Sequence, residues 1–179
     1  GDGGAIYTDD DELAQQLRMI ANHGQNKRYY HSLVGVNSRL DSIQAAILDI
    51  KLKHLDSYAA ARRAAADHYD RAFAGIGQLQ TPVRHQRSTH VFHQYTLIVR
   101  DGRRDELQAF LSSKGIPTMI YYPVPLYEQE AYQKSMANGI GKLPVTDFLC
   151  RSVLSLPMHT ELNEETLEYI CAGVKEFFK

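Results

Sequence analysis

The chain has 179 residues, of which 44% are hydrophobic, and 20 Lys and Arg residues against 21 Asp and Glu residues give a net charge of −1. This length predicts one domain, or one small domain with part of another, with enough apolar residues for a core. The charges form short mixed clusters, which argues against non-specific nucleic-acid binding. No apolar run approaches the ~18 residues of a transmembrane helix, and no signal peptide is evident, so we expect a cytoplasmic protein without membrane association.

The cysteines and histidines argue against a disulfide framework or a metal site. Cys150 and Cys171 are too few and too far apart for either, and we expect buried thiols. The eight histidines form no HxxxH or HExxH group. His90 and His93 lie three residues apart on a predicted strand, where they would face opposite sides. We therefore predict that the chain holds no metal.

The first part of the chain predicts a strand followed by a helix. Four residues rich in glycine open into a short predicted strand over residues 5–8, and the chain looks cut at this point because it does not begin with Met. Asp9 and Asp10 then predict the start of a helix that ends at His23 and Gly24. Residues 25–36 show neither helical nor alternating periodicity and are predicted to form a loop.

The segment over residues 35–48 organises the rest of the chain. Ser38 and Asp41 are spaced as a helix N-terminal cap, and the apolar residues that follow recur at helical spacing, which predicts a buried helix to about Lys53. Asn37 offers an amide donor and Arg39 a planar cation, next to backbone N–H groups that a helix start leaves unpaired. This arrangement suits an anion, and the alternative is an ordinary capped core helix with one solvated arginine.

A second long helix is predicted over residues 55–73, and the chain then predicts a compact α+β unit. Strands are expected over residues 90–100, 118–122 and 153–156, and helices over 105–113, 147–151 and after Asn163; residues 128–143 are expected to be partly helical. Pro123 breaks the second strand, so Tyr121 and Tyr122 flank a rigid loop at its end. Such loops often face ligands.

Five motifs in order along the chain resemble those of one enzyme family. They are Gly1-Asp2-Gly3-Gly4-Ala5-Ile6, Asn22-His23-Gly24, Asn37-Ser38-Arg39 with Gln44-Ala45-Ala46, Tyr122-Pro123-Val124-Pro125-Leu126 and Leu154-Ser155-Leu156-Pro157. They resemble the later part of the DegT/DnrJ/StrS family of pyridoxal-phosphate-dependent sugar aminotransferases. The resemblance implies an α/β plus α+β fold: residues 1–53 form the end of a large cofactor-binding domain with its central helix. Long helices join it to a small C-terminal α+β domain, residues 54–179, with a short antiparallel sheet.

The resemblance also implies a cofactor and roles for individual residues. It implies pyridoxal 5'-phosphate bound in a homodimer with shared active sites, in which Asn37 reaches the cofactor phosphate of the neighbouring subunit. The catalytic lysine of the family lies a few residues before the Gly1–Gly4 motif, so no catalytic residue is expected in this chain. Either the chain is a fragment, or its numbering restarts after a chemically modified lysine.

The expected substrate-binding residues are Arg39, Tyr121, Tyr122 and His23. Arg39 would hold a phosphate or carboxylate of the substrate, with a salt bridge as the alternative. The two tyrosines would contact a sugar nucleotide, with strand-end packing as the alternative. Many members of the family have His where Tyr121 stands, a departure that bears on the choice of substrate. His23 would line the site, with an ordinary helix-end histidine as the alternative.

The implied reaction is a transamination. Glutamate would donate its amine and a nucleotide-linked keto sugar, UDP-linked, would accept it, for surface polysaccharide such as O-antigen or for amino-sugar biosynthesis. One alternative is a pyridoxal-dependent sugar dehydratase of the same fold, with histidine in place of the lysine. The other is a non-catalytic α+β module for ligand binding or dimerisation.

Overall fold

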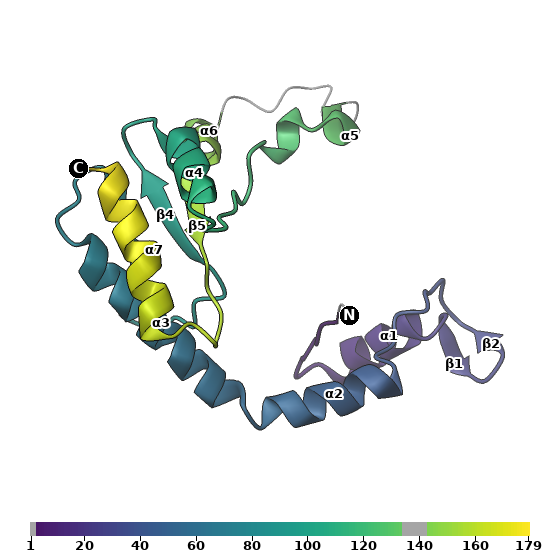
Figure 1. Ribbon diagram of the computed structural model, residues 1–179. Helices are drawn as coiled ribbons and strands as arrows, with labels where there is room; N and C mark the ends of the chain where they lie inside the picture. The colour runs from purple at the N-terminus through teal and green to yellow at the C-terminus, as the bar shows by residue number, and fades with distance from the viewer. Residues whose placement is uncertain (1–2, 134–142) are drawn as a thin grey trace. The chain divides into compact units, whose positions relative to one another are not determined.

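The computed structural model describes residues 3–133 and 143–179, and the chain forms two compact units, Gly1–Leu55 and Asp56–Lys179 (Figure 1). The first unit contains helix α1 (Asp11–Ala21), a two-stranded antiparallel ribbon of β1 (Gln25–Lys27) and β2 (Tyr30–His31), and helix α2 (Ser42–Leu52). None of the described helices has the length and apolar character needed to cross a bilayer.

Helix α1 starts and ends where the sequence predicts. The Asp10 carboxylate accepts the N–H of Leu13 at 3.0 Å, and Gly24 follows the helix with a φ of +76°. Residues 5–8 are not a strand, in contrast to the prediction, because no described segment of the first unit pairs with them. Residues 25–36 contain the β1–β2 ribbon rather than a plain loop. Its residues are mostly exposed, so its sequence carries no alternation of polar and apolar residues to reveal it.

Helix α2 begins one turn later than predicted, and it is exposed. Its cap is Asp41, whose carboxylate accepts the N–H of Gln44 at 2.9 Å, whereas Ser38 lies before the helix. No α2 residue is buried, although the sequence predicts a buried helix. Its apolar side chains include Ile43 at 74% and Ile50 at 61% exposure, because no other described element of the first unit covers them.

The second unit is built on a three-stranded antiparallel sheet in the order β3–β4–β5. These strands are β3 (Leu79–Gln80), β4 (Tyr95–Val99) and β5 (Val153–Leu156), and Tyr95 lies opposite Leu156. The helices are α3 (Leu55–Phe73), α4 (Arg104–Ser113), the 3-10 turn η1 (Leu126–Glu128), α5 (Glu130–Gln133), α6 (Pro144–Ser152) and α7 (Glu164–Phe177). The predicted helix over residues 128–143 is thus realised in part, and residues 134–142 lie outside the described residues.

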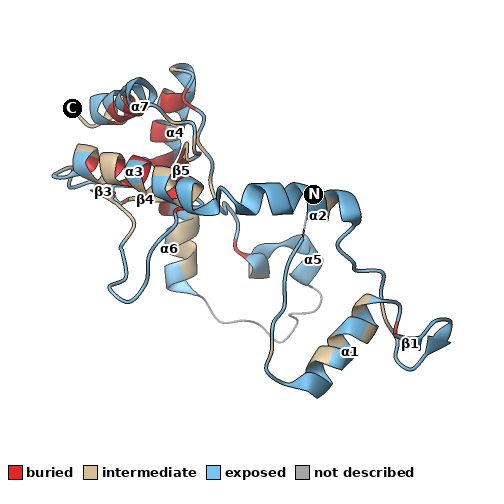
Figure 2. Cartoon of the chain, turned by 90° about the horizontal axis from the view of Figure 1, so that it is seen from below, coloured by how far each residue is buried: buried red, intermediate tan, exposed pale blue. Residues whose placement is uncertain are grey.

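The hydrophobic core of the chain lies in the second unit (Figure 2). Alternate residues of β4 are buried, and the ring of Tyr95 lies 4.9 Å from that of Tyr69 of α3. Leu107 and Leu111 of α4 and Val174 of α7 are fully buried, as the apolar spacing of both helices predicts. Asn163 caps α7 by accepting the N–H of Thr166 at 2.8 Å, which confirms the predicted start. Cys171 is buried as expected, and Cys150 is half-buried.

Two predicted strands are shorter in the structure. Residues 90–94 are not part of β4: Phe92 adopts a φ of +49°, and its N–H is accepted by Nδ1 of His90 at 2.9 Å. The prediction that His90 and His93 face opposite sides of a strand is therefore wrong. The predicted strand over residues 118–122 reduces to one antiparallel bridge between Met119 and Ser155, since Pro117 and Pro123 on either side lack the N–H groups that a longer ladder needs.

Candidate functional site

Three of the predicted site residues lie in the first unit, and the backbone brings two of them together. Asn37 forms an antiparallel bridge with Asn22, the residue before His23. The N–H of His23 donates to the carbonyl of Val36 at 2.9 Å, and its own carbonyl accepts Nδ1–H of His31 at 2.8 Å. This places His23 and Asn37 side by side at the C-terminal end of α1. Arg39 follows two residues after Asn37, in the segment that leads to α2.

Two glycines allow this close approach of chain segments. A Cβ on Gly35 would lie 2.1 Å from the backbone nitrogen of Gly24, and a Cβ on Gly24 would lie 1.8 Å from the carbonyl oxygen of Leu33. Any side chain at either position would therefore push the segment before Asn37 away from the end of α1. The tight packing of these backbones fixes where the Asn37 side chain begins.

The side chains of Asn37 and Arg39 are exposed, and within the described residues neither forms a hydrogen bond or an ion pair. An amide donor and a guanidinium without protein partners are the groups that a phosphate or carboxylate binds. The sequence predicts that N–H groups at the start of α2 help to bind the anion. In the structure the Asp41 carboxylate already accepts one of them, the N–H of Gln44, so fewer remain for an anion. The donors that fit an anion here are therefore the two side chains.

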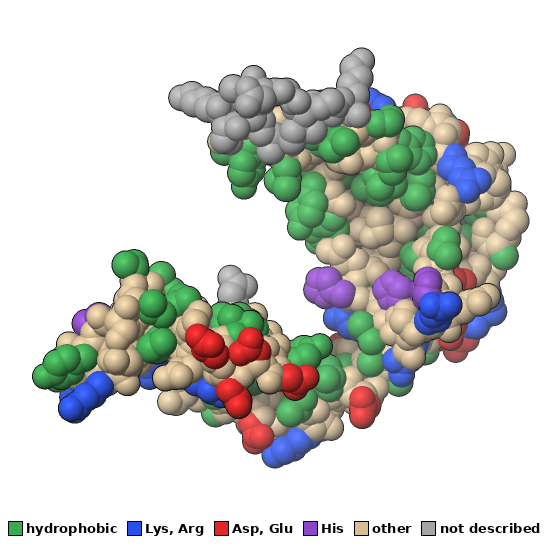
Figure 3. All heavy atoms as spheres, turned by 180° about the vertical axis from the view of Figure 1, so that it is seen from behind, with side chains coloured by type: hydrophobic (Ala, Val, Ile, Leu, Met, Phe, Trp, Pro, Cys, Tyr) green, Lys and Arg blue, Asp and Glu red, His purple; other side chains and the backbone are tan. Residues whose placement is uncertain are grey.

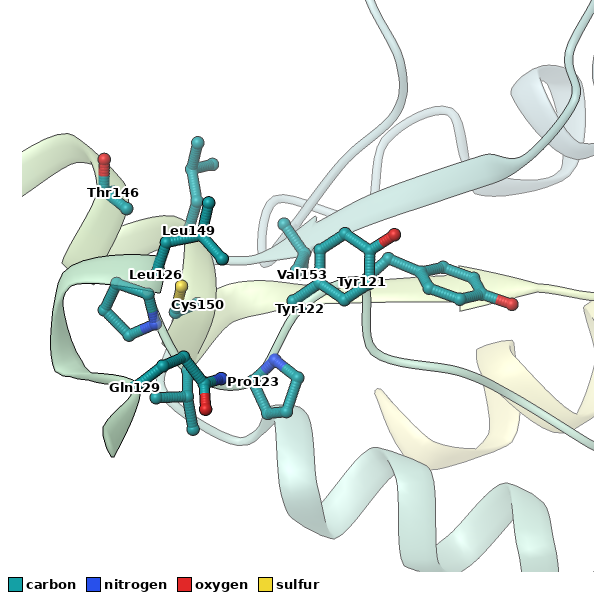
Figure 4. Close-up of a pocket in the computed structure, with 11 residues that line it drawn as sticks. Tyr121, Tyr122, Pro123, Leu126, Gln129, Thr146, Leu149, Cys150 and Val153 are labelled. Carbon is teal, nitrogen blue, oxygen red and sulfur yellow. The ribbon is translucent and has the colours of Figure 1, made fainter. Parts of the chain in front are cut away.

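The other two predicted site residues, Tyr121 and Tyr122, lie in the second unit and line a pocket of about 430 Å³ (Figure 4). Their rings meet edge to face, with centroids 5.7 Å apart. The loop that carries them forms one wall, and Thr146, Leu149 and Cys150 of α6 form the other. Most of the lining residues are apolar, and the side chains with hydroxyl or amide groups are those of Tyr121, Tyr122, Gln129 and Thr146. Such a lining suits a flat polar ligand that stacks and forms a few hydrogen bonds.

Tyr127 ties the tyrosine loop to α6. Its hydroxyl donates to the carboxylate of Asp147, and this hydrogen bond raises the pKa of Tyr127 to about 12. The phenol therefore stays protonated at neutral pH and keeps donating. The bond holds together the two walls of the pocket.

A second pocket of about 340 Å³ also includes Tyr121, and sequence analysis missed it. Its lining includes His93 and His159, two histidines far apart in the sequence to which no role was assigned. His93 lies in the segment predicted as a strand, and His159 belongs to no motif or predicted element, so the sequence carries no signal that pairs them. Only the packing of loops in the second unit reveals it.

The comparisons with known proteins agree with the resemblance found in the motifs. The model of the DegT/DnrJ/EryC1/StrS aminotransferase family matches residues 1–175. The chain belongs to this family. It is 46% identical over 181 residues to the "Pleiotropic regulatory protein" of Geobacillus stearothermophilus, covering 100% of this chain and 48% of the relative. It is 45% identical to the UDP-2-acetamido-2-deoxy-3-oxo-D-glucuronate aminotransferase of Pseudomonas aeruginosa, covering 97% of this chain and 46% of that enzyme.

Among solved structures, this family member resembles DesV of S. venezuelae with a TM-score of 0.89 and 39% sequence identity. The match covers 96% of this chain and 46% of DesV. The chain thus spans about half the length of the curated relatives it matches. The likeness confirms the expected family and the presence of helices around a small antiparallel sheet.

Proposed function

We propose that the protein transfers the amino group of glutamate to a UDP-linked keto sugar with pyridoxal 5'-phosphate as cofactor. The observation that carries this proposal is the family match over residues 1–175. The UDP-sugar aminotransferase of P. aeruginosa, 45% identical to the chain, supports a UDP-linked substrate. The product would be an amino sugar for surface polysaccharide such as O-antigen, or for a related amino-sugar pathway.

Aminotransferases of this family use pyridoxal phosphate. When bound, the cofactor supplies an electron sink for the transfer. We assign the exposed amide of Asn37 to its phosphate across the interface of a homodimer with shared sites, because burying a phosphate requires several donors. Residues 1–53 would then be the end of the cofactor-binding domain and residues 54–179 the small domain. The anchoring lysine is assigned to the polypeptide before Gly1.

We assign substrate binding to Arg39, Tyr121, Tyr122 and His23. The Arg39 guanidinium would donate two hydrogen bonds to a carboxylate or phosphate of the substrate. The rings of Tyr121 and Tyr122 would provide stacking surfaces and hydroxyl donors for the sugar nucleotide, and their pocket offers the room. His23 would contact the substrate from its place beside Asn37, where the backbone holds it.

The test is a two-step assay on the full-length protein. The protein with its cofactor is mixed with glutamate, and 2-oxoglutarate is measured; a UDP-linked 3-keto sugar is then added, and the amino sugar is measured by mass spectrometry. We expect stoichiometric 2-oxoglutarate in the first step and sustained turnover only after the sugar is added. A dTDP-linked keto sugar serves as the nucleotide control.

The alternatives make different predictions in the same assay. A sugar dehydratase would release water from the sugar without consuming glutamate. A non-catalytic module would give no product with either nucleotide while remaining folded. The likeness to the Pleiotropic regulatory protein of G. stearothermophilus favours this alternative. Either result would reject the proposed transamination.

A further inference from the structure

The second pocket, of about 340 Å³, is built from three separate segments of the second unit. Met119 and Leu156 supply apolar surface next to the Met119–Ser155 bridge. His93, His159 and Tyr121 supply polar groups, and no Asp or Glu is among the lining residues. Histidine side chains gather on one face of this unit (Figure 3). The pocket thus combines an apolar surface with hydrogen-bonding groups and has no carboxylate of its own.

One guanidinium group joins the two segments that carry the histidines. Nη1 of Arg62, on α3, donates to the carbonyl oxygens of Phe92 at 3.2 Å, His93 at 3.1 Å and Met158 at 3.1 Å. Met158 is the residue before His159, so the same cation fixes the backbone at both histidines. Arg62 therefore acts as the common anchor of this pocket.

The segment before His93 is held in an unfavourable backbone conformation. Phe92 has a φ of +49°, a region that bulky residues rarely adopt, and its side chain is buried. The ring of His90 stacks on that of Phe92 with centroids 4.0 Å apart, and Nη1 of Arg62 donates a hydrogen bond to the Phe92 carbonyl. Conformations of this kind persist where the surroundings over-determine them, and they cluster at functional sites.

The charge of Arg62 is not balanced by a carboxylate in the described part of the chain, where no Asp or Glu oxygen lies within ion-pair distance of it. Arg84, in contrast, pairs with both Asp67 and Asp70. Arg62 binds the backbone that carries the lining residues His93 and Met158. A cation without a carboxylate partner at this place favours the binding of an anion in the pocket.

His159 also presents a donor. Its Nδ1 accepts the N–H of Glu161 at 3.1 Å, so in the neutral ring the proton lies on Nε2, which is free to donate. A donating imidazole, a tyrosine hydroxyl and an unbalanced cation are complementary to phosphate oxygens.

We propose that this pocket binds the phosphate-bearing part of a nucleoside diphosphate, with His93 and His159 as ligand-binding residues and Arg62 as the positioning residue that sets them. The inference rests on the proposed function, in which the ligand is the UDP moiety of the keto sugar. Tyr121 lines both this pocket and the one it shares with Tyr122, so one nucleotide sugar can contact both.

Direct binding to the full-length protein tests the pocket, with UDP, dTDP and inorganic pyrophosphate as calorimetric probes. We expect His93→Ala and His159→Ala each to weaken UDP binding about ten-fold, as expected for hydrogen bonds to a charged group. His68→Ala, which changes a histidine outside the pocket, should leave the affinity unchanged. Pyrophosphate binding that falls in parallel assigns the histidines to the phosphates. UDP affinity within two-fold of wild type in the double variant His93→Ala/His159→Ala overturns the proposal, as does a wild-type protein that binds neither nucleotide.

Arg62 is tested by substitutions that keep or remove its charge. Arg62→Met should weaken UDP binding at least as much as the histidine variants. Arg62→Lys should recover most of the affinity, because the ammonium group keeps the positive charge and has three N–H donors for the three carbonyls. Arg63→Met on the same helix is the matched control. In turnover, the KM for the sugar nucleotide should rise in Arg62→Met, while the glutamate step stays unchanged. If Arg62→Met does not fold, the exposed histidine variants still decide the question.

The result also separates this inference from the proposed function. A protein without glutamate activity whose UDP binding depends on His93 and His159 would retain the pocket and reject transamination. A protein with full transamination activity and unchanged UDP binding in the histidine variants would reject the pocket alone.

Discussion

Arg104 is the most deeply buried charge among the described residues, and its replacement should destabilise the second unit. It is 7% exposed, and its Nη1 donates to the carbonyls of Cys150 at 3.1 Å and Val153 at 3.0 Å. These carbonyls lie where α6 ends and β5 begins, so Arg104 satisfies groups that a helix end leaves unpaired. Arg104→Met removes both hydrogen bonds and leaves two acceptors without this donor.

The magnitude follows from the two bonds and the burial. A hydrogen bond with a charged partner is worth about 1.5–3 kcal/mol, and release of the buried guanidinium from its desolvation offsets part of the sum. The ion pair with the exposed Asp105 adds little. We expect Arg104→Met to lower the free energy of unfolding by about 2–4 kcal/mol.

Urea unfolding of the full-length protein, followed by circular dichroism, measures this loss. The matched control is Arg103→Met: Arg103 is the neighbouring arginine, and its side chain is 44% exposed in its pair with Glu106. The control should cost less than about 1 kcal/mol, because exposed pairs contribute little. If the two variants unfold at the same urea concentration, the carbonyl contacts of Arg104 do not stabilise the junction of α6 and β5, and this reasoning is wrong.

Three further substitutions test other contacts. Tyr69→Phe removes the hydrogen bond to the Pro157 carbonyl at 2.9 Å but keeps the ring against Tyr95, and should cost about 1–2 kcal/mol in the same urea assay. Burial raises the pKa of the Cys171 thiol from 9.0 to about 11. The stability that this thiol contributes is therefore complete below pH 9 and is lost as the pH rises through 11. In the Cys171→Ala variant, the free energy of unfolding should fall less between pH 9 and pH 11 than in the wild type. Gly35→Ala places a Cβ 2.1 Å from the Gly24 nitrogen, and should abolish the hydrogen-exchange protection of the Val36 N–H.

The sequence predicts a helix best when the residues that determine its start and its buried face lie within the helix itself or next to it. Asp10 and Asn163 cap α1 and α7 as expected, because a cap needs only the side chain and the N–H three residues later. The apolar spacing of α3 and α4 likewise predicts the faces that enter the core. The start of α2 was placed a turn too early, since Ser38 and Asp41 are both good caps and only the path of the chain selects Asp41.

The sequence fails where distant segments determine local structure. Residues 90–94 alternate like a strand, but Arg62 binds the carbonyls of Phe92 and His93 and holds them in a loop. The ribbon of β1 and β2 has no buried face and therefore no pattern. For the site, motifs point to Asn37, Arg39 and the tyrosines, whereas the pairing of His93 with His159 depends on contacts that no local pattern encodes.

Helix α2, which follows the predicted anion site, has no buried residue. Gly24 is the single buried residue among those described in the first unit, and α2 has only 11 residues. Isolated helices shorter than about 12–15 residues are marginal in water, so α2 requires a partner for its apolar face. The Asn22–Asn37 bridge holds the backbone of Asn37, whereas Arg39 lies three residues before the first residue of α2. Packing of α2 would therefore restrict mainly the position of the Arg39 guanidinium. If Asn37 and Arg39 bind an anion as proposed, covering α2 and binding that anion are linked steps. We then expect a contact that buries Ile43 and Ile50 also to strengthen phosphate binding at these two residues.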